Sequence, residues 1–274
     1  MIKLAFSTNA FKQYSLEDSI REIAKAGYIG VEILCDVPHA YPPLFTDDLI
    51  RSLKKTLASF SIQISNLNAF TLYAIGDVYH PSWIDDSRER RIEHTIDCIR
   101  LAKKIGAKHL STEPGGPLPP LAADFCQFEK IFLNGLTKVA KIAEEENIKV
   151  LIEPEPGLLI ESSRQFKNFI TKVIDSKYIR LNFDIGHFYC VNEDPAKVVY
   201  ELSDYIEHFH LADIANTRMH NHLIPGKGSI DFRPVFDAMD DIGYRGFVTV
   251  ELYPYQDNPA QAAKEAYSYL CSMV

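Results

Sequence analysis

Short apolar runs alternate with longer amphipathic segments along the whole chain. The apolar runs have the length and composition of buried strands, and they cover residues 3–7, 30–34, 62–66, 109–113, 149–153, 180–184, 205–211 and 247–251. The amphipathic segments repeat apolar residues at helical spacing, and they cover residues 16–26, 48–60, 87–105, 125–146, 163–174, 195–202, 232–242 and 259–273. The pattern therefore predicts about eight strand–helix units.

Capping residues mark several of the predicted helix ends. Ser15 precedes the first helix and Asp18 follows three residues later, which resembles a capping box. Gly27, Gly106 and Gly243 come directly after three of the helices, where glycine commonly ends a helix in a left-handed conformation. These signals support the alternation that the apolar pattern predicts.

The order of the elements predicts the fold class. Strands that alternate with helices form a parallel sheet, and about eight units in a chain of 274 residues have the size of a (β/α)8 TIM barrel. The alternative is a doubly wound open sheet, which normally has a glycine-rich turn after its first strand. Residues 7–11 contain no glycine, so we favour the barrel. No segment has the composition of a linker, and we expect residues 1–274 to form a single domain.

The composition of the chain limits the kinds of molecule that we expect it to bind. The formal net charge is −8, which argues against a nucleic-acid partner because such proteins normally present a basic face. The five cysteines include no CxxC pair, and we expect reduced, mostly buried thiols in a cytoplasmic protein. No stretch has the roughly 18 consecutive apolar residues of a membrane span, and the first residues do not resemble a signal peptide. We therefore expect no membrane partner.

Four polar residues stand at the ends of consecutive predicted strands: Glu153, Asp184, His210 and Glu251. The C-terminal ends of barrel strands meet at one rim, so these side chains are expected to converge. His208 shares a face with His210 and is expected to lie deeper. Each residue alone is compatible with a solvated strand end, but three carboxylates and one imidazole together suit a single divalent metal. We expect Mn²⁺ first, with Mg²⁺, Co²⁺ or Zn²⁺ as alternatives.

Two further residues lie just beyond these strand ends. A tight turn at 184–187 brings His187 back over the metal, or else leaves it as a loop histidine bonded to the backbone. Glu155 stands between prolines two residues after Glu153. We expect Glu153 to be the metal ligand and Glu155 to contact a substrate hydroxyl or Arg218.

Four longer connections, at 35–46, 68–86, 114–123 and 212–229, follow strands and therefore lie at the same rim. They carry aromatic residues that either wall a pocket or only pack the loops: Tyr41, Phe45, Phe70, Tyr73 and Trp83. The last connection contains Pro-Gly-Lys-Gly at 225–228, which lacks the Walker spacing and is a weak signal for phosphate binding.

Several of these motifs resemble those of the xylose-isomerase-like barrel superfamily of sugar isomerases and epimerases. That superfamily includes ketose 3-epimerases, hydroxypyruvate isomerases and the endonuclease IV fold-mates. The resemblance covers essentially the whole chain. It rests on the sequences at 26–32 and 152–153, Asp-Ile-Gly-His at 184–187, His-Phe-His-Leu-Ala-Asp at 208–213, the glycine run at 225–228 and Val-Glu at 250–251.

The resemblance implies specific roles. Glu153, Asp184, His210 and Glu251 would bind one divalent metal, and the two glutamates would double as the acid/base pair. His187 would contact substrate oxygens near the metal.

The chain departs from the pattern of this family in the loop at 212–229. Arg218 stands roughly where epimerases keep a substrate-binding arginine, although the loop here is longer. His220 and His222 stand where endonuclease IV relatives carry Asp-x-His ligands of a second metal. The early-strand histidines of such multi-metal sites are replaced here by Asn68 and Glu113. We therefore expect one metal, with His220 and His222 as substrate-loop residues or partial ligands of a second ion.

The lead functional hypothesis is a metal-dependent isomerase or epimerase of a sugar or small hydroxy-carbonyl compound. Proton transfer by the glutamates would proceed through a metal-stabilised enediolate. The main alternative is a lyase or dehydratase of a keto-polyol, similar to inosose dehydratase. An endonuclease IV-like phosphodiesterase fits poorly because the chain is acidic and lacks the early histidines. A sugar-binding barrel without catalysis and a homo-oligomeric assembly also remain open hypotheses.

Overall fold

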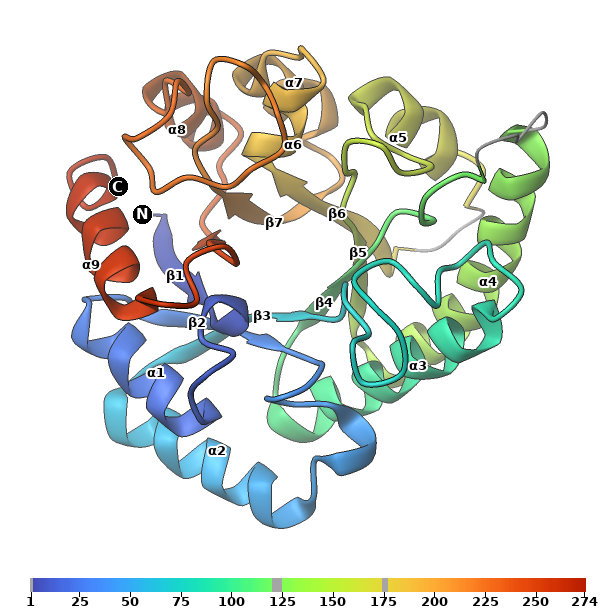
Figure 1. Ribbon diagram of the computed structural model, residues 1–274. Coiled ribbons are helices and arrows are strands. Elements are labelled where there is room, and N and C mark those ends of the chain that lie inside the picture. Colours follow the sequence, from blue (N-terminus) through green and yellow to red (C-terminus); the bar gives the residue numbers. More distant parts are fainter. Residues whose placement is uncertain (1, 120–124, 174–176) are drawn as a thin grey trace.

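In the computed structural model, which describes residues 2–119, 125–173 and 177–274, eight parallel strands close into a barrel (Figure 1). Each strand pairs with the next, and the last pairs with the first. The strands are β1 (Lys3–Ser7), β2 (Gly30–Leu34), β3 (Gln63–Asn68), β4 (His109–Thr112), β5 (Lys149–Ile152), β6 (Ile179–Asp184), β7 (Ile206–Leu211) and β8 (Phe247–Val250). The predicted (β/α)8 TIM barrel is thus confirmed, and the doubly wound alternative is wrong.

Helices surround the strands on the outside of the barrel (Figure 1). They are α1 (Leu16–Lys25), α2 (Asp47–Phe60), α3 (Arg88–Ile105), α4 (Phe125–Glu146), α5 (Ser163–Ile170), α6 (Ile185–Cys190), α7 (Pro195–Leu202), α8 (Arg233–Asp241) and α9 (Pro259–Leu270). Two 3-10 helices, η1 (Thr8–Ala10) and η2 (Pro42–Leu44), lie in the connections after β1 and β2.

The largest differences between the predicted and observed helices concern α6 and α5, and α9 ends at Leu270, three residues before its predicted end. The short helix α6 was not predicted, because its apolar residues directly continue the apolar run of β6. Helix α5 ends at Ile170, earlier than the predicted end at 174, which lies outside the described residues. The predicted loop at 114–123 also lies outside them from residue 120 onward.

The predicted caps are present. The Ser15 hydroxyl accepts a hydrogen bond from the amide of Asp18 at 3.1 Å, which satisfies a free amide at the start of α1. Gly106 ends α3 with a φ of 86°, a conformation that a residue with a side chain adopts only with strain.

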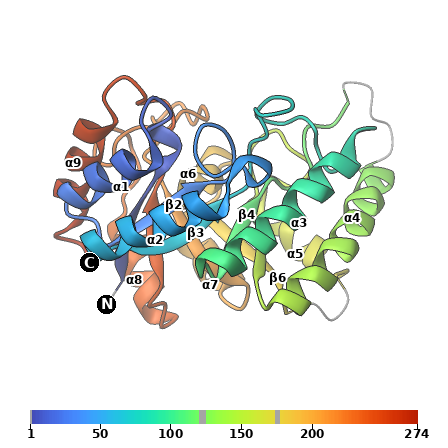
Figure 2. The same ribbon diagram turned by 90° about the horizontal axis from the view of Figure 1, so that it is seen from below.

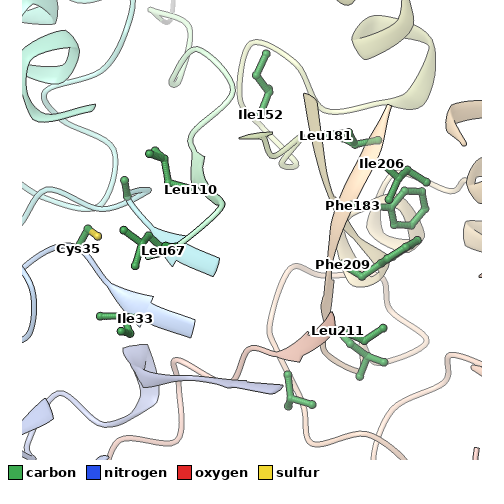
Figure 3. Packing of buried hydrophobic residues seen from close by; sticks show 14 of the residues in the cluster. Ile33, Cys35, Leu67, Leu110, Ile152, Leu181, Phe183, Ile206, Phe209 and Leu211 are labelled. Atoms are coloured by element: carbon green, nitrogen blue, oxygen red, sulfur yellow. The ribbon is translucent and has the colours of Figure 1, made fainter. Parts of the chain in front are cut away.

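The strands separate apolar from polar side chains. Figure 3 shows apolar residues of the strands, among them Phe183, Phe209 and Leu211, which belong to the hydrophobic core. The residues that alternate with them are polar and buried, and the register pairs Asn182 with His208 and Asp184 with His210. Because alternate residues of a strand face opposite sides, the polar set lines the inside of the barrel.

Figure 2 shows the barrel from the side, with the long connections that follow the strands gathered at one end and both chain termini near the other. Among the described residues, no helix has both the length and the apolar character needed to cross a membrane. All five cysteines are free thiols, as predicted, but only Cys35 and Cys98 are fully buried, whereas Cys126 and Cys271 are exposed.

Candidate functional site

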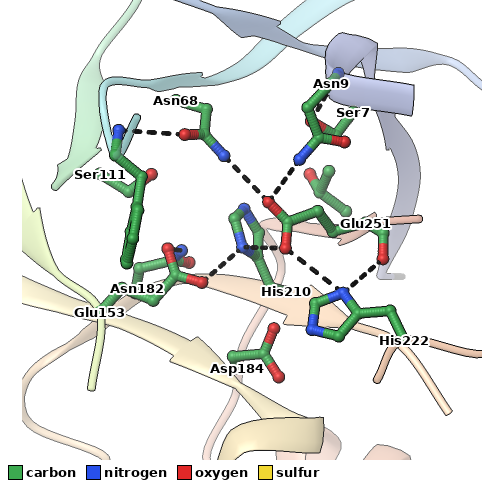
Figure 4. Close-up of polar contacts among 12 residues, drawn as sticks. Ser7, Asn9, Asn68, Ser111, Glu153, Asn182, Asp184, His210, His222 and Glu251 are labelled. Carbon is green, nitrogen blue, oxygen red and sulfur yellow. Dashed lines mark hydrogen bonds and ion pairs between the residues drawn. The ribbon is translucent and has the colours of Figure 1, made fainter. Parts of the chain in front are cut away.

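The four predicted metal ligands meet at the C-terminal rim of the barrel (Figure 4). Glu153 directly follows β5, Asp184 ends β6, His210 lies in β7, and Glu251 directly follows β8. Each offers one ligand atom, and these atoms all lie within 4.8 Å of one another. All four side chains are buried. Neighbouring strands of the closed sheet thus bring together residues that are far apart in the sequence.

His210 presents its Nδ1 atom to two of the carboxylates. This atom lies 2.8 Å from Glu153 Oε1 and 3.8 Å from Glu251 Oε2. Burial alone would lower the pKa of His210, but Glu153, Glu32 and Glu251 outweigh it and raise the pKa well above its usual value. Without a metal, His210 is therefore a cation that holds the carboxylates together.

Asp184 has one oxygen without a hydrogen bond, although His187 Nε2 lies 3.8 Å from it. Its Oδ1 accepts a hydrogen bond from the amide of His187 at 2.9 Å, which caps α6. Its Oδ2 is buried and has no hydrogen-bond partner among the described residues. A buried carboxylate oxygen without a partner is costly, and a bound cation would satisfy it.

The remaining oxygens of the two glutamates are fixed by amide side chains. Asn182 Nδ2 donates to Glu153 Oε2 at 2.8 Å. Asn9 and Asn68 donate to Glu251 Oε1 at 2.7 Å and 3.0 Å (Figure 4). Each glutamate is thus anchored through one oxygen and presents the other toward His210.

Negative charge accumulates at this rim. Burial raises the pKa of Glu251 to about 8; His210 opposes this rise, and the nearby Glu153 and Glu32 carboxylates add to it. Three carboxylates and one imidazole, together with the unpartnered oxygen of Asp184, fit a divalent cation. The donor set alone does not distinguish Mn²⁺ from other divalent ions.

Glu32 is a site residue that the sequence analysis missed. It lies in β2, is fully buried, and its Oε2 is 2.6 Å from His210 Nε2. The amides of Asn66 and Asn68 also donate to it, at 2.7 Å and 3.3 Å. The signal was present in the sequence, because a glutamate inside an otherwise apolar strand is rarely buried without a partner.

His208 lies deeper in the barrel, as predicted, and both of its ring nitrogens have hydrogen-bond partners. Its Nδ1 is 2.9 Å from Asn182 Oδ1, and its Nε2 is 2.9 Å from the hydroxyl of Thr249. Asn182 donates to Glu153 through its amide nitrogen, so its oxygen must accept from His208. His208 therefore supports Glu153 through Asn182.

A cavity of about 230 Å³ opens beside the quartet. Glu153, Glu155, Glu251 and His187 line it, so the predicted position of Glu155 and His187 near the metal ligands agrees with the structure. Further lining comes from aromatic residues of the loops, Phe70, Tyr73, Tyr79 and Tyr253. The cavity suits a small polar molecule, with aromatic walls around a polar floor.

Three histidines form a second cluster at the same cavity. His187 Nδ1 donates to the carbonyl of Pro154 at 2.9 Å, and His222 Nδ1 donates to the carbonyl of Glu251 at 2.9 Å. Since a carbonyl can only accept, neutral forms of both rings carry a lone pair on Nε2. His220 Nε2 lies 3.1 Å from His222 Nε2, and the ligand atoms of all three rings lie within 4.8 Å of one another.

The structure does not bring Arg218 into this cavity. Its guanidinium stacks over the ring of Tyr189 at 3.9 Å and donates to the Tyr189 carbonyl. Arg218 has a φ of 58°, so the chain turns there and the side chain lines a separate depression beside Asp231. The expected contact between Glu155 and Arg218 is replaced by a hydrogen bond from the Tyr79 hydroxyl to Glu155, at 2.9 Å.

The glycine run at 225–228 is not a free phosphate cradle. The amides of Gly226 and Gly228 donate to Asp213 Oδ2 at 2.9 Å and 2.8 Å. The amide of Ile230 donates to the other oxygen of the same carboxylate at 3.1 Å. Asp213 thus occupies the amides that a phosphate would need, and the run instead shapes the loop that holds His220 and His222.

Some of the aromatic residues in the long loops form a wall of the cavity, whereas others only pack the loops. Phe70 and Tyr73 line the cavity. Trp83 is buried, packs against Phe132 with ring centroids 5.5 Å apart, and donates to the Thr112 hydroxyl, so it packs the loop. Tyr41 lines another depression of the surface.

Comparison with known proteins gives the family. A family model described as the xylose isomerase-like TIM barrel matches residues 20–273. The chain belongs to this family. An inosose dehydratase of Clostridium beijerinckii is 24% identical over an alignment 278 residues long, gaps included, and the alignment spans 94% of this chain and 90% of that protein.

Solved structures of other proteins share the fold. A D-tagatose 3-epimerase-like protein superposes with a TM-score of 0.82 and 25% identity, over 99% of this chain and 98% of that one. The IOLI protein, whose structure has a bound zinc atom, superposes with a TM-score of 0.80 and 19% identity, over 100% of this chain and 98% of that one. The named dehydratase relatives are enzymes.

Proposed function

We propose that this protein is a divalent-metal-dependent enzyme that transfers a proton at the carbon beside a carbonyl group, in a sugar or small hydroxy-carbonyl compound. The observation that carries this proposal is the matched placement of Glu153 and Glu251. Both carboxylates line one cavity, and each is anchored through one oxygen while the other faces His210 Nδ1. Two such groups can remove and return a proton on one small substrate.

Glu153, Asp184, His210 and Glu251 would hold one metal ion, and we propose Mn²⁺, with Mg²⁺, Co²⁺ or Zn²⁺ as substitutes. When bound, the ion supplies a Lewis acid that polarises a carbonyl and acidifies the neighbouring C–H. The unpartnered Oδ2 of Asp184 supports this assignment.

In the lead form of the proposal, one glutamate takes the proton from the carbon and the other returns a proton. Return to the opposite face of the same carbon gives epimerisation. Return to the neighbouring carbon, with a proton passing from the hydroxyl oxygen to the former carbonyl oxygen, gives isomerisation. The Nε2 of His187 has no hydrogen-bond partner among the described residues, lies 3.8 Å from Asp184 Oδ2, and can bind a substrate hydroxyl. The protein needs no organic cofactor for this chemistry.

A dehydratase is the second candidate, favoured by the inosose dehydratases among the relatives. The first proton removal is the same, but a hydroxyl group then leaves from the adjacent carbon as water. Glu155, which lines the cavity, lies within reach of the same substrate as Glu153. The two candidates share their residues and differ in their products.

Solvent deuterium separates the candidates. The metal-loaded protein is incubated in deuterated water with a panel of ketoses, inososes and hydroxypyruvate, and products are followed by NMR. Deuterium on the substrate carbon without loss of water supports an isomerase or epimerase, whereas an unsaturated product supports a dehydratase. Absence of both across the panel, with metal bound, counts against the proposal and favours a binding protein.

We propose a single catalytic ion, with His220 and His222 acting as loop residues at the cavity. The histidine cluster supplies a specific alternative, because the ligand atoms of His187, His220 and His222 also converge. Metal content after equilibrium dialysis decides between them: one ion per chain supports the proposal, and two ions, falling to one in His220→Ala, assign the second to the cluster.

A further inference from the structure

Lys12 is the one lysine or arginine among the described residues that line the cavity. It follows η1 in the connection after β1. The carboxylates and imidazoles around it are three glutamates, Glu153, Glu155 and Glu251, and the three histidines of the cluster. Lys12 is therefore the one ammonium or guanidinium group at the edge of this cavity within the described part of the chain.

The Lys12 ammonium lies against an aromatic ring of the cavity wall. Its Nζ lies 4.4 Å from the centroid of the Tyr73 ring, within the range of a cation–π contact. The segment that carries Tyr73 is held by Asp36, which accepts hydrogen bonds from the Thr71 hydroxyl and the amides of Tyr73 and Ala74. The backbone at Tyr73 is thus held in place, and Lys12 lies beside the ring that this backbone carries.

Neither of the nearest acids is free to pair with Lys12. Both oxygens of Asp36 already accept hydrogen bonds, from the Thr71 hydroxyl and from backbone amides at 37, 73 and 74. Glu251 receives Asn9 and Asn68 on Oε1 and turns Oε2 toward His210. Within the described part of the chain, no carboxylate forms an ion pair with Lys12.

A half-buried ammonium without an ionic partner is costly. Burial lowers the pKa of Lys12, and the more distant Asp36 and Glu251 charges only partly oppose this. Buried charges in proteins are normally paired, and one that faces a cavity acquires its partner with the ligand.

We propose that Lys12 binds an anionic group of the substrate, a carboxylate or a phosphate, so that the substrate is an acidic hydroxy-carbonyl compound rather than a neutral sugar. This inference rests on the proposed function, since it places the reacting carbon at the glutamates and the anion at Lys12. The cavity volume of about 230 Å³ limits the substrate to a short sugar acid or sugar phosphate. Without Lys12, the glutamates would repel such an anion.

The test is direct binding to the metal-loaded full chain, measured by calorimetric titration. The probes are hydroxypyruvate for a carboxylate, D-fructose 6-phosphate for a phosphate, and D-fructose and scyllo-inosose as neutral compounds. We expect one of the two anions to bind at least about tenfold more tightly than both neutral probes, and the anion that does so identifies the group. A hydrogen bond to a charged group contributes about ten- to hundredfold in affinity.

Matched variants isolate the ammonium. Lys12→Met should lower the affinity for the preferred anion by about ten- to hundredfold. The affinities for the neutral probes should stay within about twofold of the wild type. Lys12→Arg should retain most of the anion affinity. Lys55→Met removes the same charge from an exposed position on α2 and should change nothing. Thermal unfolding of each variant checks that the fold is intact.

Two results would overturn the inference: neutral probes that bind the wild type as tightly as both anions, or a Lys12→Met variant that weakens all four probes equally. Deuterium exchange in the same samples keeps the two proposals apart. If deuterium exchanges into a neutral probe and this exchange does not depend on Lys12, the anion site is rejected and the proposed function stands. Anion binding that depends on Lys12, without exchange on any probe, supports the anion site and counts against the proposed function.

Discussion

The Nε2 atom of His210 lies 2.6 Å from the Oε2 atom of Glu32, on the opposite edge of the ring from Glu153. A metal held by the quartet would take the lone pair of Nδ1, because this is the nitrogen that faces Glu153 and Glu251. The remaining proton must then sit on Nε2 and be donated to Glu32. Such carboxylate–histidine pairs behind a metal fix the tautomer and make the ring a stronger ligand.

Replacing Glu32 should therefore weaken metal binding without removing a ligand. We expect Glu32→Gln to lower the affinity for Mn²⁺ by about tenfold to hundredfold, measured by calorimetry. With Zn²⁺ bound, nitrogen NMR of the wild type should show the His210 proton on Nε2. The control Glu145→Gln, at an exposed position of α4, should bind metal normally. Unchanged affinity in Glu32→Gln would show that the pair has no positioning role.

Glu251→Gln should keep the fold and abolish turnover. The glutamine oxygen can still accept hydrogen bonds from Asn9 and Asn68, but the side chain can no longer accept a proton from carbon. Loss of a general base typically lowers the rate by about 10² to 10⁴-fold, which deuterium exchange into the substrate measures. Wild-type exchange rates in this variant would remove Glu251 from the mechanism, provided that unfolding temperatures match.

Part of this site could be predicted from the sequence. Glu153, Asp184, His210 and Glu251 stand at the ends of apolar runs, and barrel topology alone brings such positions together. The anchoring residues were harder to find. Asn68 was placed just beyond a strand predicted to end at 66, whereas β3 extends to Asn68 and turns this amide into the barrel.

The loop residues depend on local backbone geometry that the sequence pattern does not carry. Arg218 leaves the cavity because it adopts a positive φ and stacks on Tyr189. His220 and His222 reach the cavity because Asp213 gathers the amides of the glycine run beneath them. Such conformations follow from hydrogen bonds between distant residues, which apolar periodicity does not record.

Glu113 predicts a pH dependence of stability away from the metal ligands. Burial raises the pKa of this carboxyl to about 7, against the effects of Arg91 and the Trp83 amide. Between about pH 4.5 and 7 the folded state holds a proton that the unfolded state has released, so stability falls as pH rises through this window. The loss can reach about 1.4 kcal/mol per pH unit.

Glu113→Gln tests this dependence, because glutamine resembles the protonated acid. Denaturant unfolding of both proteins at several pH values between 5 and 8 should show the wild type losing stability relative to the variant as pH rises. A difference that is constant with pH would mean that Glu113 is ionised in the folded protein throughout.

Metal should stabilise the fold through Asp184. Adding Mn²⁺ at about a hundredfold above its dissociation constant should stabilise the protein by about 2.7 kcal/mol, visible as a higher unfolding temperature. Asp184→Asn retains an oxygen that can cap α6 through the His187 amide, but replaces the unpartnered oxygen with an NH₂ group that cannot bind a cation. We expect this variant to fold and to lose the metal-induced shift, whereas His220→Ala should keep it. A shift that survives in Asp184→Asn and disappears in His220→Ala would instead place the stabilising ion at the histidine cluster.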